Sequence, residues 1–323
     1  MQGKVLPEPN TMAPVYAGID VCKEWLDVYV HAVGRSLRVA NDGCGRRRLN
    51  RELAALGVTR VVMEATGKYH RAAQRCLHAA GFAVAVVDPL RARLFAKACG
   101  LLAKTDRIDA RLLALMGEAL EPAAVAPPPE ALQELQELVN ARTAATAERT
   151  ALTNRRKAAQ TAFLRAELGR RLTAVKSHVE RLDAEIERRI GAAPELARRY
   201  AILTSIPGVG AVTAAVLIAN FTELGACSGK QAAMLAGVAP VACESGERIG
   251  HRAIKGGRLG VRNAVYMAAL SASSHNADLT AFASRLRQAG KPAKVVLVAV
   301  MRKLIILANT LINQNRPWSP IAP

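Results

Sequence analysis

The side chains best suited to chemistry in this sequence are four carboxylates. Asp20 follows a run of apolar residues, Glu64 stands near the end of a second such run, and Asp106 and Asp109 lie three residues apart in a helical pattern, where they share one face. Carboxylates brought together repel one another unless hard cations neutralise them. Two Mg²⁺ ions bound there would activate a nucleophile and stabilise a leaving oxygen during phosphodiester cleavage. The four acids together predict a metal site, whereas three other aspartates are expected to be helix caps or solvated turn residues: Asp27, Asp42 and Asp88.

A second chemical feature is a glycine-rich basic loop at residues 243–260, which carries Ser245 in a Ser-Gly pair. A serine among phosphate-binding charges is a candidate nucleophile. By itself a Ser-Gly pair is typical of a turn, and the cations would equally suit binding of a nucleic-acid backbone. The candidate phosphate-binding side chains are Arg248, Arg252, Lys255, Arg258 and Arg262.

The acids need a sheet that brings them together, and residues 15–121 predict one. The order β-β-β-α-β-α-β-α indicates a mixed sheet with helices packed on it. With acids on the first strand, the fourth strand and the last helix, this is the layout of an RNase H-like nuclease core. Ahead of it, residues 1–14 predict a flexible lead. The expected strands are 15–21, 26–33, 36–40, 58–65 and 82–88, and the expected helices are 45–56, 70–80, one that starts at 89, and 105–120.

The remainder of the chain predicts helices. A proline-rich linker at 122–129 precedes residues 130–200, where apolar spacings of four and three predict two long antiparallel helices of the coiled-coil type. Residues 201–323 predict an all-α C-terminal domain. Its segment LTSIPGVG joins two helices through Gly208 and Gly210, the pattern of a helix-hairpin-helix, whose backbone N–H groups meet a DNA phosphate.

Charge points to a polyanionic partner. The 323 residues include 45 Lys and Arg and 26 Asp and Glu, so that the formal net charge is +19. Residues 201–323 hold thirteen basic and four acidic residues, a net charge of +9, and are the strongest candidate for contact with nucleic acid. Hydrophobic residues make up 51% of the chain, which excludes wholesale disorder.

Other classes of protein are disfavoured. None of the six cysteines has zinc-ribbon or zinc-finger spacing. The polar, proline-containing N-terminus does not resemble a secretory signal. The apolar run 295–311 is interrupted by Arg302 and Lys303, and it is expected to be too short and too charged to span a bilayer. A reducing cytoplasm with free thiols fits best.

With these features together, the sequence resembles the DEDD-type transposases of the IS one-ten insertion-sequence family, the bridge-RNA-guided recombinases. The resemblance covers residues 15–318. One departure is Glu244, which precedes the serine where some relatives have a second serine or another small residue. Five segments carry the resemblance in this order: YAGIDVCKEWLDVYV, VVMEATGKYH, AKTDRIDARLLA, LTSIPGVGAVTAAVLIANF and ESGERIGHRAIKGGRLGVRNAVYMAAL.

The resemblance implies a RuvC-like N-terminal domain, a coiled-coil arm and a C-terminal transposase domain. It places the four family acids on Asp20, Glu64, Asp106 and Asp109, and the catalytic serine on Ser245. It implies two Mg²⁺ ions per site, with Mn²⁺ as a substitute, and a composite site whose acids and serine come from different protomers of a dimer or tetramer. The implied partners are duplex DNA at the element ends and target, and a structured guide RNA. No membrane is implied, and the expected location is the bacterial cytoplasm, at the nucleoid.

Three functions stay open on the sequence. The leading one is a recombinase that excises and inserts its own mobile element through a phosphoserine link to DNA. The alternative is an Mg²⁺-dependent, RuvC-like, structure-selective DNA nuclease that cuts with water and forms no covalent intermediate. The third is a non-catalytic nucleic-acid-binding scaffold. The four acids argue against the scaffold, and Ser245 with its cations argues against the nuclease.

Overall fold

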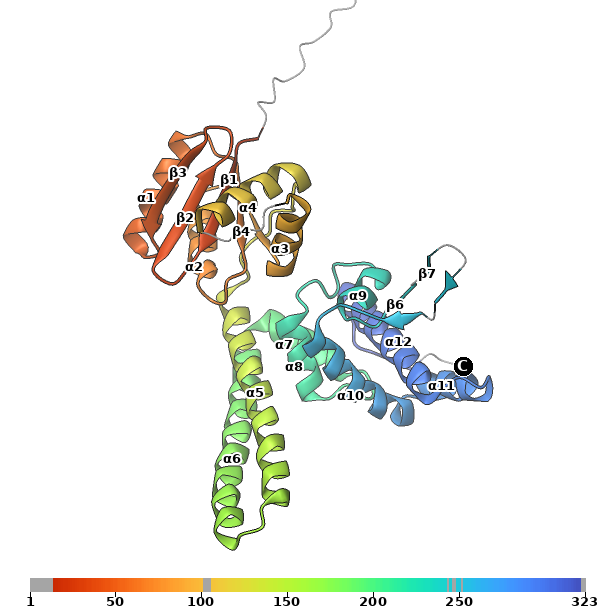
Figure 1. The fold of residues 1–323 in the computed structure, drawn as a ribbon. Coiled ribbons are helices and arrows are strands. Elements are labelled where there is room, and N and C mark those ends of the chain that lie inside the picture. The colour runs from red at the N-terminus through yellow and green to blue at the C-terminus, as the bar shows by residue number, and fades with distance from the viewer. Residues whose placement is uncertain (1–13, 101–105, 243, 246–247, 251, 321–323) are drawn as a thin grey trace, which may run out of the picture. The chain divides into compact units, whose positions relative to one another are not determined.

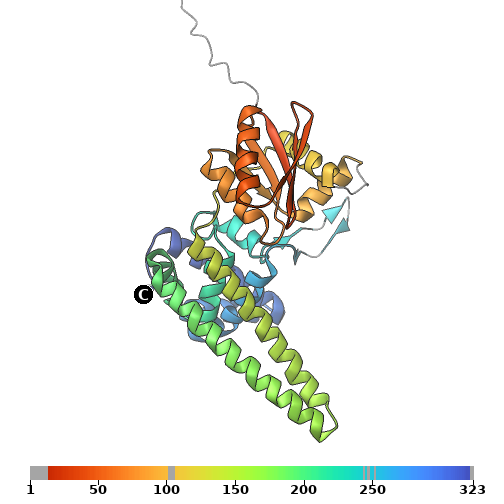
Figure 2. The ribbon, with the colours of Figure 1, turned by 90° about the vertical axis from the view of Figure 1, so that its left-hand side faces the viewer.

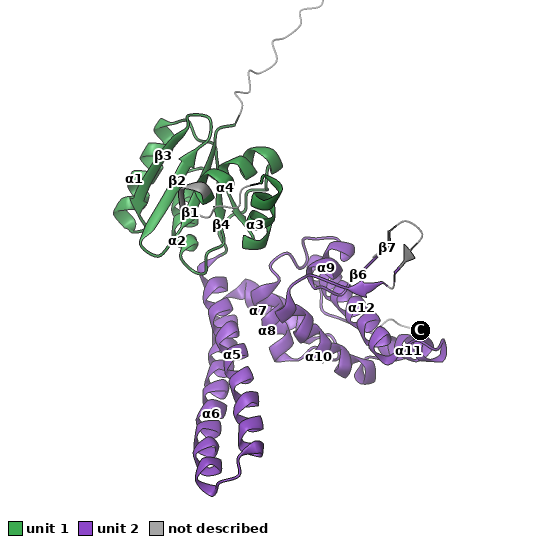
Figure 3. Ribbon diagram, viewed as in Figure 1, with its two compact units in different colours: residues 1–128 green, residues 129–323 purple. Residues whose placement is uncertain are grey.

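The structure is a computed structural model in two compact units, Met1–Pro128 and Pro129–Pro323 (Figure 3). Most of the predicted lead, residues 1–13, lies outside the residues that it describes. The structure describes residues 14–100, 106–242, 244–245, 248–250 and 252–320.

The first unit is built on a mixed five-stranded sheet of order β3-β2-β1-β4-β5 (Figure 1). The first three strands pair antiparallel, whereas β4 runs parallel to β1 and β5 runs parallel to β4. The predicted mixed sheet with helices packed on it is confirmed. The elements are β1 (Tyr16–Val21), β2 (Trp25–Val30), β3 (Arg35–Ala40), α1 (Gly43–Ala55), β4 (Arg60–Glu64), α2 (His70–Ala79), β5 (Ala83–Val87), α3 (Pro89–Ala98) and α4 (Asp106–Leu120).

Helices cover both faces of this sheet. On one face Ile19 of β1 is packed in a core with Leu49 of α1 and Leu77 of α2. On the other face Val62 of β4 shares a core with Leu113 of α4. Helix α4 contacts β1, β2 and β4, so that it lies across the centre of the sheet. This second face carries the candidate acids.

The three aspartates expected to be caps or turn residues divide into two groups. Asp42 accepts a hydrogen bond from the backbone N–H of Gly45 at 2.7 Å and caps α1, and Asp88 caps α3 through the N–H of Leu90 at 2.8 Å. The prediction for Asp27 was wrong. This residue lies within β2 with 8% of its surface exposed, because it faces α4 rather than solvent.

Two long helices form the N-terminal part of the second unit. They are α5 (Glu130–Ala158) and α6 (Ala162–Ala192), and they run side by side in opposite directions (Figures 1 and 2). The two antiparallel helices expected for this region are present, and their coiled-coil packing stays a prediction. Ion pairs join their outer faces: Arg142 with Asp183, Arg189 with Glu134, and Arg171 with Glu148.

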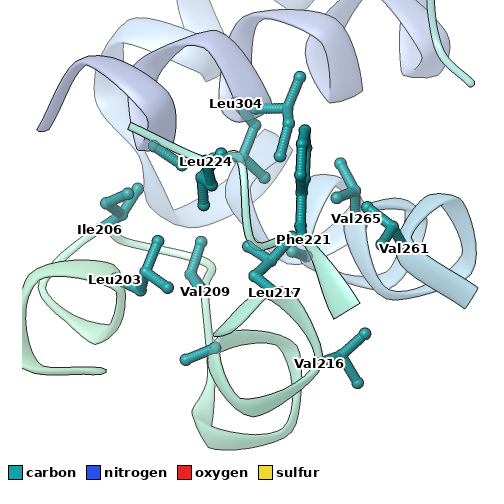
Figure 4. Close-up of a cluster of buried hydrophobic side chains, with 14 of the residues drawn as sticks. Leu203, Ile206, Val209, Val216, Leu217, Phe221, Leu224, Val261, Val265 and Leu304 are labelled. Carbon is teal, nitrogen blue, oxygen red and sulfur yellow. The ribbon is translucent and has the colours of Figure 1, made fainter. Parts of the chain in front are cut away.

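The rest of the second unit is largely helical and shares one core, but the prediction that residues 201–323 are all-α was wrong, because four two-residue strands lie between Pro240 and Ile254. Phe221 is fully buried there with Leu203, Val261 and Leu304, each from a different helix or connection (Figure 4). Leu135 of α5 belongs to the same core, so the base of the helical pair is continuous with the C-terminal helices. The helices are α7 (Pro194–Thr204), α8 (Ala211–Asn220), α9 (Gly229–Leu235), α10 (Leu259–His275), α11 (Ala277–Gln288) and α12 (Ala293–Asn313).

Helix α12 is longer than the sequence suggests. It has 21 residues, and its most apolar window has a mean hydropathy of 2.1, so by length and composition alone it is long and apolar enough to cross a membrane. The expectation that this run is too short was therefore wrong. A core helix has the same composition, and 44% of that window is buried inside the protein, with Val300 and Leu304 in the core of the second unit. The packing accounts for the apolar character of this helix.

Candidate functional site

The contact between α4 and β1 depends on Gly18. A Cβ atom placed on Gly18 would lie 2.0 Å from the backbone oxygen of Ala110 and 2.4 Å from the backbone nitrogen of Ala114. Real carbon atoms do not approach so closely, so the helix backbone rests directly on the strand at a position where only glycine fits. This contact fixes the distance between the sheet and the helix that carries two of the acids.

The direction of α4 brings its first turn to the level of Asp20. Gly117 lies against the ring of Tyr16, whereas Gly18 meets Ala110, so α4 runs antiparallel to β1. Two strand residues advance about 6.6 Å, which corresponds to about four helix residues. Two residues beyond Gly18 along the strand, at Asp20, the helix has therefore reached the turn that contains Asp109.

Strand register brings Glu64 beside Asp20. In the parallel pairing of β1 with β4, Gly18 is opposite Val62 and Ile19 is opposite Met63, so that the next pair is Asp20 with Glu64. Val62 packs in the core beneath α4, and side chains two residues apart on a strand share a face. Asp20 and Glu64 therefore lie on the α4 face, and both are half-buried, as is Asp109.

A fifth carboxylate adjoins this group and was not predicted as part of it. Asp27 is the antiparallel partner of Asp20 on β2. Both of its oxygens accept hydrogen bonds from Arg38 of β3, from Nε and Nη2, each at 2.8 Å. Beside this ion pair lies a cavity of about 350 Å³, also lined by Ala110 of α4. The sequence signal was available, since an aspartate inside an alternating strand that faces the sheet interior needs a cationic partner.

The donor chemistry of the acid group suits a hard divalent cation, because every predicted ligand is a carboxylate. Asp106 is the first residue of α4, and its side chain lies outside the described residues. Among the side chains that are described, no three His, Cys, Asp or Glu residues lie close enough together to form a metal site. The strand register and the direction of α4 bring Asp20, Glu64 and Asp109 to the same edge of the sheet, but not within the spacing of a metal site, and their role as ligands stays a prediction.

Ser245 is carried by a hairpin in the second unit. The hairpin begins with a ladder in which β6 (Pro240–Val241) pairs with β9 (Ala253–Ile254). Further out β7 (Glu244–Ser245) pairs with β8 (Arg248–Ile249), so that Ser245 is opposite Arg248. The side chains of these two residues lie outside the described part of the chain.

The hairpin returns to the helices through two glycines with left-handed backbone. Gly256 and Gly257 both have φ of +68°. A Cβ on Gly257 would lie 2.2 Å from the backbone nitrogen of Gly237, and Arg258 donates its backbone N–H to the oxygen of Leu235 at 2.8 Å. A residue without a side chain is needed at Gly257, because its backbone touches that of Gly237.

Arg258, one of the predicted phosphate ligands, has a structural partner. Its guanidinium nitrogens donate to both carboxylate oxygens of Glu223 at 2.6 Å and to the carbonyl of Asn220 at 3.1 Å, and the group lies 5.6 Å from the ring centroid of Phe221. These hydrogen bonds hold the pKa of Glu223 below its ordinary value. The Arg258 side chain therefore anchors the start of α10, and its contact with phosphate stays a prediction.

The other predicted phosphate-binding positions differ in exposure. Arg252 and Lys255 are exposed, and Arg262 is half-buried. Gly208 has φ of +98°, and a Cβ there would lie 2.5 Å from Ala272 of α10, so this glycine is required for packing. Gly210 is exposed and precedes α8 without a side-chain cap.

Comparison with known proteins identifies both parts of the chain. Residues 17–163 match a family model described as a transposase, and residues 200–284 match the model of the transposase IS116/IS110/IS902 family. An α/β unit and a helical unit that both match transposase models define a DNA transposase, an enzyme that recombines DNA. The chain belongs to the IS110 (IS one-ten) family of transposases.

Two curated relatives extend over nearly the whole chain. The pilin gene-inverting proteins of Moraxella bovis and Moraxella lacunata are each 28% identical to it over 321 residues, which is 95% of this chain and 98% of theirs. A solved structure, T. thermophilus RuvC in complex with a Holliday junction substrate, is 17% identical over 35% of this chain and 99% of that chain, with a TM-score of 0.28.

Proposed function

We propose that this transposase excises and inserts its own insertion sequence, with its acids binding divalent cations and Ser245 acting as the nucleophile on DNA. One observation carries the metal part of the proposal. The register of β1 and β4 and the direction of α4 bring Asp20, Glu64 and Asp109 to one edge of the sheet. The serine part is supported by the family to which the chain belongs and by the motif around Ser245.

The acids would hold two Mg²⁺ ions, with Mn²⁺ as a substitute, and these would polarise the scissile phosphate and stabilise the leaving oxygen when bound. The chain's own contribution is to fix the carboxylates. Asp20 and Glu64 come from adjacent strands, and Asp106 and Asp109 come from a helix held against those strands at Gly18. Ligands on such elements move little relative to one another.

The proposed covalent step begins at the hydroxyl of Ser245. Its oxygen attacks the phosphorus of a DNA phosphodiester, so that an Oγ–P bond forms and the bond from phosphorus to one deoxyribose oxygen breaks. The serine proton passes to a base, and the leaving oxygen takes up a proton and departs as a hydroxyl. The exposed cations Arg252 and Lys255 offset the charge of the phosphate. Because the phosphoserine link retains an ester bond to phosphorus, a DNA hydroxyl can reverse the step and rejoin the strands.

The proposed partners follow from charge and family. Duplex DNA at the element ends and target would contact the basic C-terminal part, with Gly210 offering the uncapped N-terminus of α8 to a phosphate in a helix-hairpin-helix. A structured guide RNA would select the sites. We infer a homodimer or homotetramer that acts in the bacterial cytoplasm, at the nucleoid.

A covalent adduct tests the proposal directly. The wild-type protein is incubated with its element-end DNA, its guide RNA and Mg²⁺, and protein–DNA adducts resistant to SDS are separated on a denaturing gel. We expect an adduct with the wild type and none with Ser245→Ala, which should still bind DNA and RNA. Ser245→Cys should retain a trace, because a thiol is a similar though larger nucleophile.

The alternative, an Mg²⁺-dependent RuvC-like nuclease, predicts the opposite result. With water as the nucleophile, Ser245→Ala would cleave DNA at the wild-type rate and no adduct would appear with either protein. That outcome would replace the recombinase proposal.

A further inference from the structure

A groove with a volume of about 600 Å³ lies in the second unit beside α12. Pockets of about 300–1,000 Å³ hold ligands of the size of a nucleotide. The walls come from α12, α11 and the β6–β9 ladder, and most of their surface is apolar. Its apolar lining includes Pro240, Ile254, Phe282, Val295, Val298 and Ile306.

The rim of this groove is positively charged. Arg252, Lys294, Arg302 and Lys303 line it, and no acidic residue is among its described lining residues. The ammonium group of Lys303 lies 4.3 Å from the ring centroid of Phe282, a cation–π contact that holds the charge at the groove. Cations around an apolar floor suit a ligand that is anionic at its edge and apolar at its centre.

The floor of the groove is open to solvent. Val295 is 52% exposed although it belongs to a helix whose other face is buried in the core. Duplex DNA would not use such a surface, because its bases are stacked inside and its outside presents phosphates and sugars. An unpaired strand would use it, since the face of a base would remove these apolar side chains from water while neighbouring phosphates meet the cations.

The groove lies beside the base of the hairpin that carries Ser245, the proposed nucleophile on DNA. Pro240 and Ile254, which line it, form one pair of the β6–β9 ladder. The hairpin that carries Ser245 extends from the other pair of this ladder, Val241 with Ala253. A strand lying in the groove therefore passes the base of that hairpin.

We propose that this groove binds an unpaired DNA strand. A base lies against Val295 and Val298, and flanking phosphates are held by Lys294, Arg302 and Lys303. The inference rests on the proposed function in one respect, that DNA is the polyanion. It requires neither the Ser245 hydroxyl nor a divalent cation.

Equilibrium binding in EDTA tests the proposal without chemistry. The probes are a short fluorescein-labelled oligodeoxythymidine and an abasic strand of the same length, and their affinities for the full chain are measured by anisotropy over a range of salt concentrations. We expect the wild type to prefer the strand with bases by about tenfold, the gain from removing roughly 55 Å² of apolar surface from water. Val295→Ser should remove this preference. Lys294→Gln should reduce the slope of log affinity against log salt by about 0.7, the value for one single-strand phosphate.

Matched controls come from elsewhere in the chain. Val33→Ser alters a valine that is 55% exposed in the first unit, and Lys176→Gln alters an exposed lysine of α6. Both variants should bind as the wild type does. Ser245→Ala should also keep the base preference, so that a missing adduct with the wild type would count against the serine chemistry and leave the groove standing.

Four results would overturn the proposal. The first is equal affinity of the wild type for the abasic strand and the oligodeoxythymidine. The second is a base preference that survives in Val295→Ser. The third is a Val295→Ser variant with unchanged DNA affinity but an altered sedimentation coefficient, which would make the groove a protein interface. Tighter binding of oligouridine than of oligodeoxythymidine would overturn the assignment to DNA.

Discussion

The acid group and the serine hairpin are positioned by different physical means. The acids lie on two adjacent strands and a helix, and one backbone contact at Gly18 sets the spacing between them. Ser245 lies on a ladder of two-residue strands that is tied to the helices by Gly257 and by the Arg258–Glu223 ion pair. The acids therefore depend on the core of their unit, whereas the serine depends on a few local contacts. Changes to the Gly18 contact should therefore affect stability and activity together, whereas changes around the hairpin should affect activity more than stability.

Loss of an acid should have the largest effect on activity. Asp20→Asn replaces a predicted ligand with a neutral group of the same shape, and we expect strand transfer to fall below detection in a plasmid recombination assay. The melting temperature should not fall, since removing one of several neighbouring like charges relieves repulsion. Near-normal recombination by this variant would show that Asp20 is not a ligand.

Gly18→Ala should have the largest effect on stability. The added Cβ would meet the α4 backbone, which cannot move without disturbing the sheet, so we expect a loss of about 3 kcal/mol in the free energy of unfolding. Urea denaturation measures this loss in the free energy of unfolding. Gly191→Ala is the matched control, because that helical glycine of α6 has nothing within 4 Å of its Cβ position and alanine favours a helix by about 1 kcal/mol. Equal stability of the two variants would contradict the close contact.

Two adjacent glycines where the hairpin rejoins the helices distinguish the effect of a steric clash from that of backbone strain. Gly256 and Gly257 have the same φ, but a Cβ has open space at Gly256 and meets Gly237 at Gly257. Gly256→Ala should cost about 1 kcal/mol from backbone strain alone. Gly257→Ala should carry that strain together with the clash, and should reduce adduct formation by more. Equal adduct yields from the two variants would show that the Gly257 contact does not position the hairpin.

Lowering the pH should weaken the Arg258–Glu223 ion pair, and this change should have the smallest effect on stability. The pKa of Glu223 in the folded protein is held below the ordinary value of 4.5 by the hydrogen bonds from Arg258. Its contribution to stability is therefore present above about pH 4.5 and is lost as the pH falls through the folded-state pKa. The partly exposed pair should contribute less than about 1 kcal/mol. The difference in unfolding free energy between wild type and Glu223→Gln, measured between about pH 6 and about pH 3, should shrink as the pH falls. A difference that stays constant would contradict the assignment.

The elements of the fold were predictable where local pattern and packing agree. Runs such as YAGIDV alternate or stay apolar in the way that sheet strands require, and the order of strands and helices along the chain followed from them. The place of Asp27 within an alternating strand was visible in the sequence, but the residue was misassigned because its partner Arg38 comes from another strand and cross-strand pairing is not visible in a local window. The partner of Arg258 was missed for the same reason, since Glu223 lies 35 residues away. The positions of Asp20 and Glu64 on their strands followed from pattern, but their adjacency required the register.

The helical pair α5–α6 leaves the body of its unit and returns to it at the same place, because Leu135 near its start and Ile190 near its end belong to one core. The length of the helical pair can therefore change without altering the core that holds its two ends. Seven residues added to each helix, two turns, would extend the tip by about 10 Å without changing the connections at the base. Insertions of equal length in both helices would therefore change how far the tip of the pair extends, and both candidate sites would stay unchanged.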